Sequence, residues 1–124
     1  MTTAINGLDV YRRELLKGST ETLILSLLAE QEMYGYQLAK EMERRSGGYF
    51  HLKEGTLYPA LHRLERDGLI EGHWELSETG QSRRYYHVSA RGMDRLDAML
   101  AEWSTFSDAV NRIARPVSVP AYVA

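Results

Sequence analysis

The chain has 124 residues, 44% of them hydrophobic and 26% charged, which is the size and composition of one soluble globular domain. It contains no cysteine, which excludes disulfides, thiolate metal ligands and cysteine nucleophiles, and its net charge of −2 points to neither a nucleic-acid nor a membrane partner. The longest largely apolar stretch, residues 22–29, is too short to cross a bilayer, and the first residues lack the apolar core of a signal peptide, so we expect a cytoplasmic location.

Two helices are predicted in the first quarter of the chain. Residues 9–16 form a short helix that Gly18 ends, and residues 1–7 are expected to fray. The second helix begins at Ser19 or Thr20, which are both good N-caps, and continues to Gln31. Its buried face is expected to consist of Leu23, Ile24, Leu27 and Leu28.

Two more helices follow. The third opens at Tyr34 and ends at Gly47-Gly48, with Leu38, Ala39 and Met42 directed inward. The fourth covers residues 55–67, with Leu57, Leu61 and Leu64 directed inward. Pro59 fits the first turn of this helix if Thr56 is the N-cap, whereas an earlier start predicts a bend at Pro59.

The hydrophobic period changes from 3.6 to 2 after the fourth helix. Residues 70–76 alternate as a half-buried strand, and residues 83–88 form the returning strand of a hairpin that must rest on the helices. A last helix is predicted from residue 89 to residue 113, followed by an irregular tail that contains Pro116 and Pro120.

This order of elements predicts a mostly helical α+β fold, a winged helix-turn-helix with a long C-terminal dimerisation helix. We divide the chain into a DNA-binding domain at residues 8–90, the dimerisation helix at 91–113 and the tail at 114–124. In this design the fourth helix enters the major groove of DNA and the hairpin, or wing, reaches the backbone. The alternative is a winged fold that binds another protein and no DNA.

Hydroxyl, imidazole and guanidinium groups on the exposed side of the fourth helix and on the wing suit contacts to phosphates and base edges. Basic charge is also concentrated between residues 81 and 95. The candidate DNA-binding residues are Tyr34, Thr56, Tyr58, His62, Arg63, Arg83, Arg84 and Tyr85.

Three stretches carry a family resemblance. Residues 34–38 (YGYQL), 55–70 (GTLYPALHRLERDGLI) and 83–92 (RRYYHVSARG) resemble the PadR family of bacterial transcriptional regulators. The single C-terminal helix is similar to the small subfamily. The resemblance implies a homodimeric repressor that reads a palindromic operator in double-stranded DNA and responds to a small aromatic or cationic ligand. The family's glycine-rich wing loop is reduced here to one glycine, within residues 78–81.

The last helix carries two apolar sets that each repeat every seven residues, which is the pattern of a coiled-coil seam. The predicted dimerisation residues are Leu96, Met99, Trp103, Phe106, Val110 and Ile113. Met93 and Leu100 form a second stripe that we expect to face the winged domain. Trp103 is either an interface anchor or, as the resemblance to small PadR-like regulators implies, a platform on which a flat ligand stacks at the two-fold axis.

Enzymatic and metal-dependent functions find no support in the sequence. Nucleophile and phosphate-loop motifs are missing, so we predict no catalytic residue and no cofactor. His73 and His87 could face each other across the hairpin, but two ligands do not make a metal site, and none is predicted.

Overall fold

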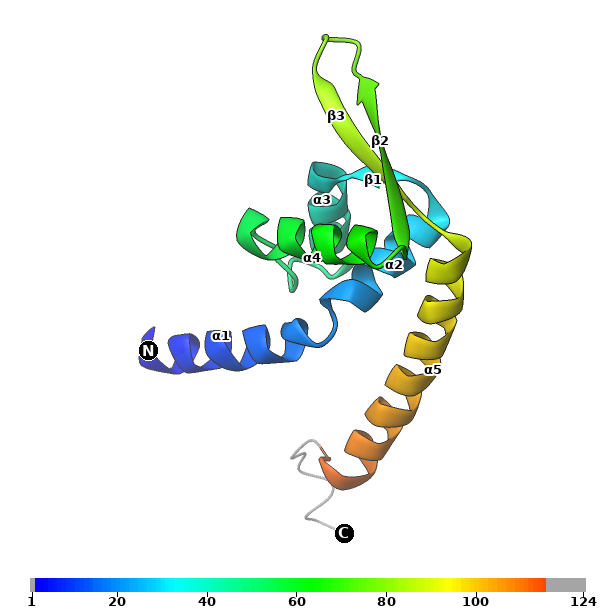
Figure 1. Cartoon of the computed structure of the whole chain (residues 1–124). Coiled ribbons are helices and arrows are strands. Elements are labelled where there is room, and N and C mark those ends of the chain that lie inside the picture. The colour runs from blue at the N-terminus through cyan, green and yellow to red at the C-terminus, as the bar shows by residue number, and fades with distance from the viewer. Residues whose placement is uncertain (1, 116–124) are drawn as a thin grey trace.

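The computed structural model describes the backbone of residues 2–115 and the side chains of residues 8–115. Five helices and three strands follow one another along this part of the chain (Figure 1). They are α1 (Thr2–Lys17), α2 (Thr20–Glu30), β1 (Met33–Tyr34), α3 (Gly35–Arg45), α4 (Glu54–Arg66), β2 (Ile70–Leu76), β3 (Ser82–Val88) and α5 (Ala90–Ile113). The predicted winged helix-turn-helix with a long C-terminal helix is confirmed. None of the described helices combines the length and the apolar composition needed to cross a bilayer.

The first helix is longer than predicted. It begins at Thr2, so most of the residues that we expected to fray are helical. At its other end, the hydroxyls of Ser19 and Thr20 donate to the carbonyls of Leu15 and Leu16 at 3.3 and 2.9 Å. Ser19 is the N-cap of α2 by position, but its side chain bonds back to α1. The two helices are therefore joined by a tight turn at Gly18.

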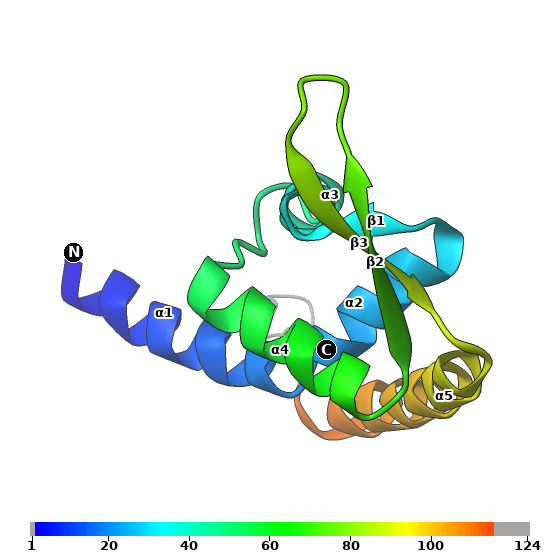
Figure 2. The same cartoon turned by 45° about the horizontal axis from the view of Figure 1, so that its top comes forward.

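The core lies where α2, α3, α4 and the base of the sheet meet. The inward residues predicted for the second, third and fourth helices are buried or partly buried. The largest fully buried side chains are Ile24, Leu25, Met33, Leu38, Leu61, Leu64, Leu69 and Ile70. Figure 2 shows α4 and α2 below the base of the hairpin, which extends away from them.

The hairpin belongs to a three-stranded antiparallel sheet in the order β1-β3-β2. The sequence analysis predicted β2 and β3 but not β1, whose two residues pair with Tyr86 and Tyr85. Tyr34 is also the N-cap of α3, and its backbone N–H donates to the Gln37 side chain at 3.2 Å. The strand therefore connects the wing directly to the first turn of α3.

The fourth helix begins at Glu54, one residue before the predicted start, and its N-cap is Lys53 rather than Thr56. The Lys53 carbonyl accepts from the N–H groups of Thr56 and Leu57, both at 2.9 Å. Pro59 consequently lies inside the helix and removes the hydrogen bond to the Gly55 carbonyl. Gly55 is exposed, so solvent can satisfy that carbonyl.

The long helix α5 leaves the base of the sheet and extends away from the winged domain (Figure 1). Its N-cap is Ser89, whose hydroxyl accepts from the Gly92 N–H at 3.0 Å and donates to the Gly68 carbonyl at 2.7 Å. Helix α5 ends at Ile113, as predicted. Of the predicted irregular tail, residues 116–124 lie outside the described residues.

The apolar seam of α5 is packed against the winged domain in its first half and exposed in its second half. Leu96 is 4% exposed and packs in the core of its own chain, so almost none of the side chain predicted for a dimer interface is left exposed for one. Met99 is partly buried against the same core, whereas Met93 and Leu100, expected to face the winged domain, are exposed. The stripe that contacts the domain is therefore the seam itself, because the seam runs past α2 before it leaves the domain.

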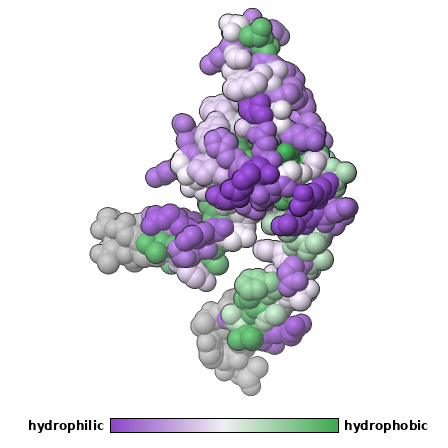
Figure 3. Space-filling view, in the orientation of Figure 1, coloured by the Kyte–Doolittle hydropathy of each residue, from purple (hydrophilic) through white to green (hydrophobic). Residues whose placement is uncertain are grey.

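The second half of the seam is uncovered. Exposure is 54% for Trp103 and 86% for Ile113, and Phe106 and Val110 between them are also exposed. Figure 3 shows hydrophobic side chains gathered on the lower part of α5. Helix α1 also extends from the domain and exposes Leu8, Val10, Tyr11 and Leu15. Helix α1 and the second half of α5 thus both expose apolar surface of a kind that monomeric proteins rarely leave exposed to solvent.

Candidate nucleic-acid interface

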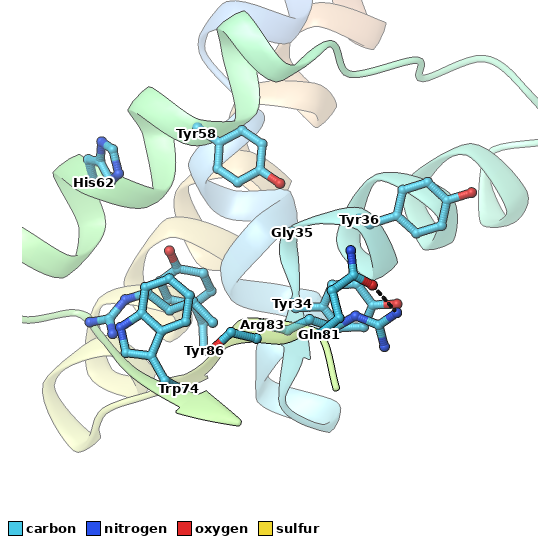
Figure 4. A pocket seen from close by; sticks show the side chains of 11 residues that line it. Tyr34, Gly35, Tyr36, Tyr58, His62, Trp74, Gln81, Arg83 and Tyr86 are labelled. Atoms are coloured by element: carbon cyan, nitrogen blue, oxygen red, sulfur yellow. Dashed lines mark hydrogen bonds between the residues drawn. The ribbon is translucent and has the colours of Figure 1, made fainter. Parts of the chain in front are cut away.

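A groove of about 440 Å³ lies between the start of α3, the exposed side of α4 and the wing (Figure 4). Its lining comprises Tyr34, Gly35, Tyr36, Tyr58, His62, Trp74, Gln81, Ser82, Arg83, Arg84 and Tyr86. Five of the eight predicted DNA-binding residues are in this set: Tyr34, Tyr58, His62, Arg83 and Arg84. The fold therefore gathers on one concave surface side chains that are far apart in the sequence, from Tyr34 to Tyr86.

Tyr58 is positioned by close packing against the first turn of α3. A Cβ atom at Gly35 would lie 2.6 Å from the Tyr58 hydroxyl and 2.9 Å from its ring, so only glycine leaves room for the ring. Figure 4 shows the hydroxyl directed from α4 toward α3. His62 follows one turn later on α4 and also faces the groove.

The Arg84 guanidinium is fixed by contacts with other residues of its own chain. Its guanidinium donates to the Glu65 carboxylate of α4, which raises the pKa of Arg84 above its ordinary value. It also lies 5.6 Å from the centre of the Trp74 ring and 5.8 Å from that of Tyr86. A Cβ at Gly72 would come within 2.8 Å of the Arg84 Nε, so this glycine lets the arginine cross β2. Arg84 thus ties the wing to α4.

Arg83 has a different environment. Its guanidinium lies 4.6 Å from the centre of the Tyr34 ring, and it donates to the Gln81 side chain at 3.4 Å. Among the described residues Arg83 has no carboxylate partner within ion-pair distance. Of the two wing arginines, Arg83 is therefore the one with a free positive charge at the groove.

The other three predicted residues lie outside the groove. Arg63 forms an ion pair with Glu21 of α2 at 3.2 Å, on the opposite flank of α4 from Tyr58. Thr56 is exposed on the same flank, one helical repeat of seven residues before Arg63. Tyr85 does not line the groove, although it shares a face of the sheet with Arg83 and with its cross-strand partner Tyr34, whose ring it meets edge-on with 5.2 Å between the ring centres.

Five aromatic or polar residues of the groove were not among the predicted DNA-binding residues: Tyr36, Trp74, Gln81, Ser82 and Tyr86. Tyr36 is exposed on α3, with the Lys40 ammonium 5.5 Å from its ring. Tyr36 lies on the side of α3 opposite the buried Leu38 and Met42, so the helical pattern of the sequence could have predicted that it is exposed. Trp74, an apolar position in the predicted alternation of residues 70–76, is 64% exposed, and Gln81 lies in the wing turn.

The groove combines a free guanidinium, phenol hydroxyls, an imidazole and exposed aromatic rings. Burial raises the pKa of Tyr86 at its base, so this phenol stays neutral. These groups can donate to phosphate oxygens and to acceptors on base edges. Chemically the surface suits an anionic, hydrogen-bonding polymer better than an apolar partner.

A second groove of about 480 Å³ lies between the end of α1 and the middle of α5. Met99, Trp103 and Phe106 supply its apolar side, and Glu14 and Glu102 supply carboxylates. It includes Trp103, the predicted ligand-binding residue. It adjoins the uncovered half of the seam.

Comparisons with known proteins agree with this architecture. The model of the transcriptional regulator PadR-like family matches residues 24–98. Transcriptional regulator Rv3488 of Mycobacterium tuberculosis is 35% identical over 80 residues, covering 64% of this chain and 71% of that protein. The solved structure of a transcriptional regulator from Clostridium thermocellum is 31% identical, with a TM-score of 0.77 and coverage of 82% of this chain and 99% of that one. A PadR-like regulator from Bacillus cereus is 33% identical, with a TM-score of 0.72 and coverage of 83% and 98%.

Proposed function

The chain belongs to the PadR-like family of transcriptional regulators, as its three motifs predicted, and from this premise we propose that it is a homodimeric repressor that binds double-stranded DNA. Members of this family are transcriptional regulators, so the expectation that the chain is not an enzyme is confirmed. The observation that carries the proposal is the groove that joins Tyr58 and His62 of α4 to Arg83 of the wing.

In the proposed complex α4 enters the major groove and the wing lies along the adjacent backbone. Tyr58 and His62 face base edges, and Arg83 contacts a phosphate. Arg84 and Arg63 do not contact DNA directly in this proposal, because each guanidinium is already paired with a carboxylate of its own chain. This assignment moves the phosphate contact predicted for both wing arginines onto Arg83 alone.

The proposal is tested by fluorescence anisotropy with DNA from the region upstream of the chain's own gene. Arg83→Ala should weaken binding to all sequences alike and reduce the slope of log affinity against log salt by about one unit. Arg95→Ala removes the same charge from an exposed position on α5 and should leave the slope unchanged. Equal slopes for wild type and Arg83→Ala would show that Arg83 does not contact a phosphate. Absence of any DNA binding would favour the protein-interaction alternative.

The proposed dimer forms through the uncovered half of the α5 seam, with a contribution from the exposed apolar face of α1. Trp103, Phe106, Val110 and Ile113 are exposed along one side of the helix, while Leu96 is already occupied within its own chain. A two-fold arrangement presents two α4 helices to a palindromic operator, with half-sites about 34 Å or a multiple apart.

A small aromatic or cationic ligand fits the second groove. Trp103 offers a flat face, and the carboxylates of Glu14 and Glu102 favour positive charge. Titration with a planar aromatic cation should quench the fluorescence of Trp103. Trp74 also emits, so Trp103→Ala is the blank. Quenching that persists in this variant would place the ligand elsewhere.

A further inference from the structure

Three potential metal ligands meet on the outer face of the wing sheet. Glu32 precedes β1, His73 lies on β2 and His87 lies on β3. One ligand atom from each lies within 4.8 Å of the other two. The His73 and His87 rings are 6.3 Å apart between their centres. The site is separate from the DNA groove, whose lining does not include any of the three.

The strand register explains why these residues converge. His87 pairs with Glu71 across β2–β3, and Met33 pairs with Tyr86, which brings Glu32 beside His87 on the other edge. Residues two apart on a strand share a face, so His73 stands on the same side as Glu71. The opposite face holds the buried Met33 and Tyr86. The two faces of the sheet thus separate a core side from a polar side.

Carboxylates surround both imidazoles. The His73 Nε2 lies 2.7 Å from the nearer Glu75 oxygen and 3.7 Å from a Glu32 oxygen. The His87 Nε2 lies 2.9 Å from a Glu71 oxygen. The Tyr85 ring lies nearly parallel to the His73 ring, with 6.1 Å between the ring centres. With three carboxylates around two imidazoles, the cluster attracts a cation and repels phosphate.

We propose that Glu32, His73 and His87 bind a divalent transition-metal ion, with Zn²⁺ as the best-matched probe. Two imidazoles and a carboxylate are a ligand set that zinc accepts, and Glu71 or Glu75 is placed to complete four-fold coordination. Bonds of about 2.0–2.1 Å require ligand atoms closer together than 4.8 Å. All three side chains are partly exposed at this surface and can close the gap by small rotations.

Metal binding would join three parts of the fold. Glu32 lies in the connection between α2 and β1, and the two histidines lie on the two strands of the wing. An ion held by all three fixes the wing relative to the segment that leads into α3. The sequence analysis predicted no metal site because only the two histidines could be placed together; Glu32 is added by β1, which the sequence analysis did not predict.

Isothermal titration of the untagged protein with ZnCl₂ tests the proposal. Wild type should bind a single ion per chain, and both His73→Ala and His87→Ala should weaken binding by at least about tenfold, because losing even an outer partner of a ligand costs about 10- to 100-fold. His51→Ala is the matched control, since His51 pairs with Glu43 at 3.4 Å and is not one of the grouped ligands. It should bind zinc like the wild type.

Glu32→Gln distinguishes the three-element site from a pair of histidines on the wing. It keeps the shape of the side chain and should weaken zinc binding by at least about tenfold, and it should also abolish the zinc-dependent rise in melting temperature. Circular dichroism confirms that each variant is folded. Wild-type affinity in either histidine variant, or in Glu32→Gln, would overturn the proposal, as would a wild-type protein that binds no zinc.

Discussion

Tyr58 owes its position to the absence of a side chain at Gly35. Gly35→Ala would place a methyl group 2.6 Å from the phenol oxygen, so the ring must move out of the groove. We expect DNA binding to weaken by about 1 kcal/mol, the net value of one hydrogen bond, while the fold persists. Anisotropy measures the effect, and Tyr58→Phe separates the hydroxyl from the ring. Unchanged affinity in Gly35→Ala would show that Tyr58 does not contact DNA.

The two wing arginines should differ in what they stabilise. Arg84→Ala leaves the partly buried Glu65 without its partner and should lower the free energy of unfolding by about 1–2 kcal/mol. Arg83→Ala removes a partly buried group that has no ion-pair partner among the described residues and should change it by less than about 0.5 kcal/mol. Urea unfolding of both variants measures the difference. Equal stabilities would mean that the Arg84–Glu65 pair contributes nothing to holding the wing on α4.

At the scale of elements, periodicity predicted the parts whose local pattern and tertiary packing agree. Examples are the cap at Ser89 and the apolar stripe of α2, where the residues that form the element also carry the pattern that predicts it. β1 has two residues, too few for any period, and exists because β3 offers it an edge. Trp74 obeys the alternation, but β2 has by then extended beyond the helices, so the residue stays exposed.

The candidate site was predictable to the extent that it lies on one element. Tyr58 and His62 could be read from the exposed side of α4. The contrast between Arg83 and Arg84 could not, because it depends on Glu65 and Gly72 from two other elements. Likewise, the heptad spacing of α5 could not show where the winged domain ends, and that point decides which seam residues are already buried.

The junction between α5 and the winged domain depends on Gly92. A Cβ there would lie 2.0 Å from the Leu69 carbonyl oxygen, a backbone atom that cannot move aside easily. Gly92→Ala should therefore destabilise the protein by about 1–3 kcal/mol or more. Gly55→Ala, in the first turn of α4 with open space around it, should be neutral or stabilising by up to about 1 kcal/mol. Thermal unfolding of the two variants compares them, and similar melting temperatures would contradict this account.

Helices α2 and α3 are linked by a charge network with a defined pH range. Hydrogen bonds from Arg44 and Arg45 lower the pKa of Glu41 from 4.5 to about 2, and Arg45 also binds Glu30 at the end of α2. Since the folded-state pKa is lowered, the stabilisation is complete above about pH 4.5 and is lost as the pH falls through about 2.

Glu41→Gln should accordingly be less stable than the wild type at neutral pH, and the difference should shrink as the pH falls from 4.5 toward 2. These groups are exposed, so 1 M salt should also reduce it. Urea unfolding at several pH values measures the difference. Glu78→Gln, in the exposed wing turn, is the control. A difference that stays constant with pH would show that Glu41 acts through packing and not through charge.

At the scale of the whole molecule, assembly should depend on the distal half of α5. Phe106→Asp introduces a charge into the exposed seam and should convert the dimer to a folded monomer that no longer binds an operator. Ala101→Asp introduces the same charge on the opposite side of α5 and should leave the dimer intact. Sedimentation equilibrium at micromolar concentration measures both. A monomeric wild type would disprove the proposed assembly.

The continuous seam of α5 also has a thermodynamic consequence. Leu96 contributes to the folding of one chain and Phe106, in the proposed dimer, to the contact between two chains, yet both lie on a single helix whose start packs against the winged domain at Gly92. If the exposed half of the α5 seam is covered only in the dimer, dilution separates the two chains and removes the apolar burial that stabilises this half of the helix. Mass action then makes the apparent stability of each chain rise with its own concentration. The concentration of the protein would thereby set both the fraction of operator DNA that is occupied and the fraction of chains that is folded.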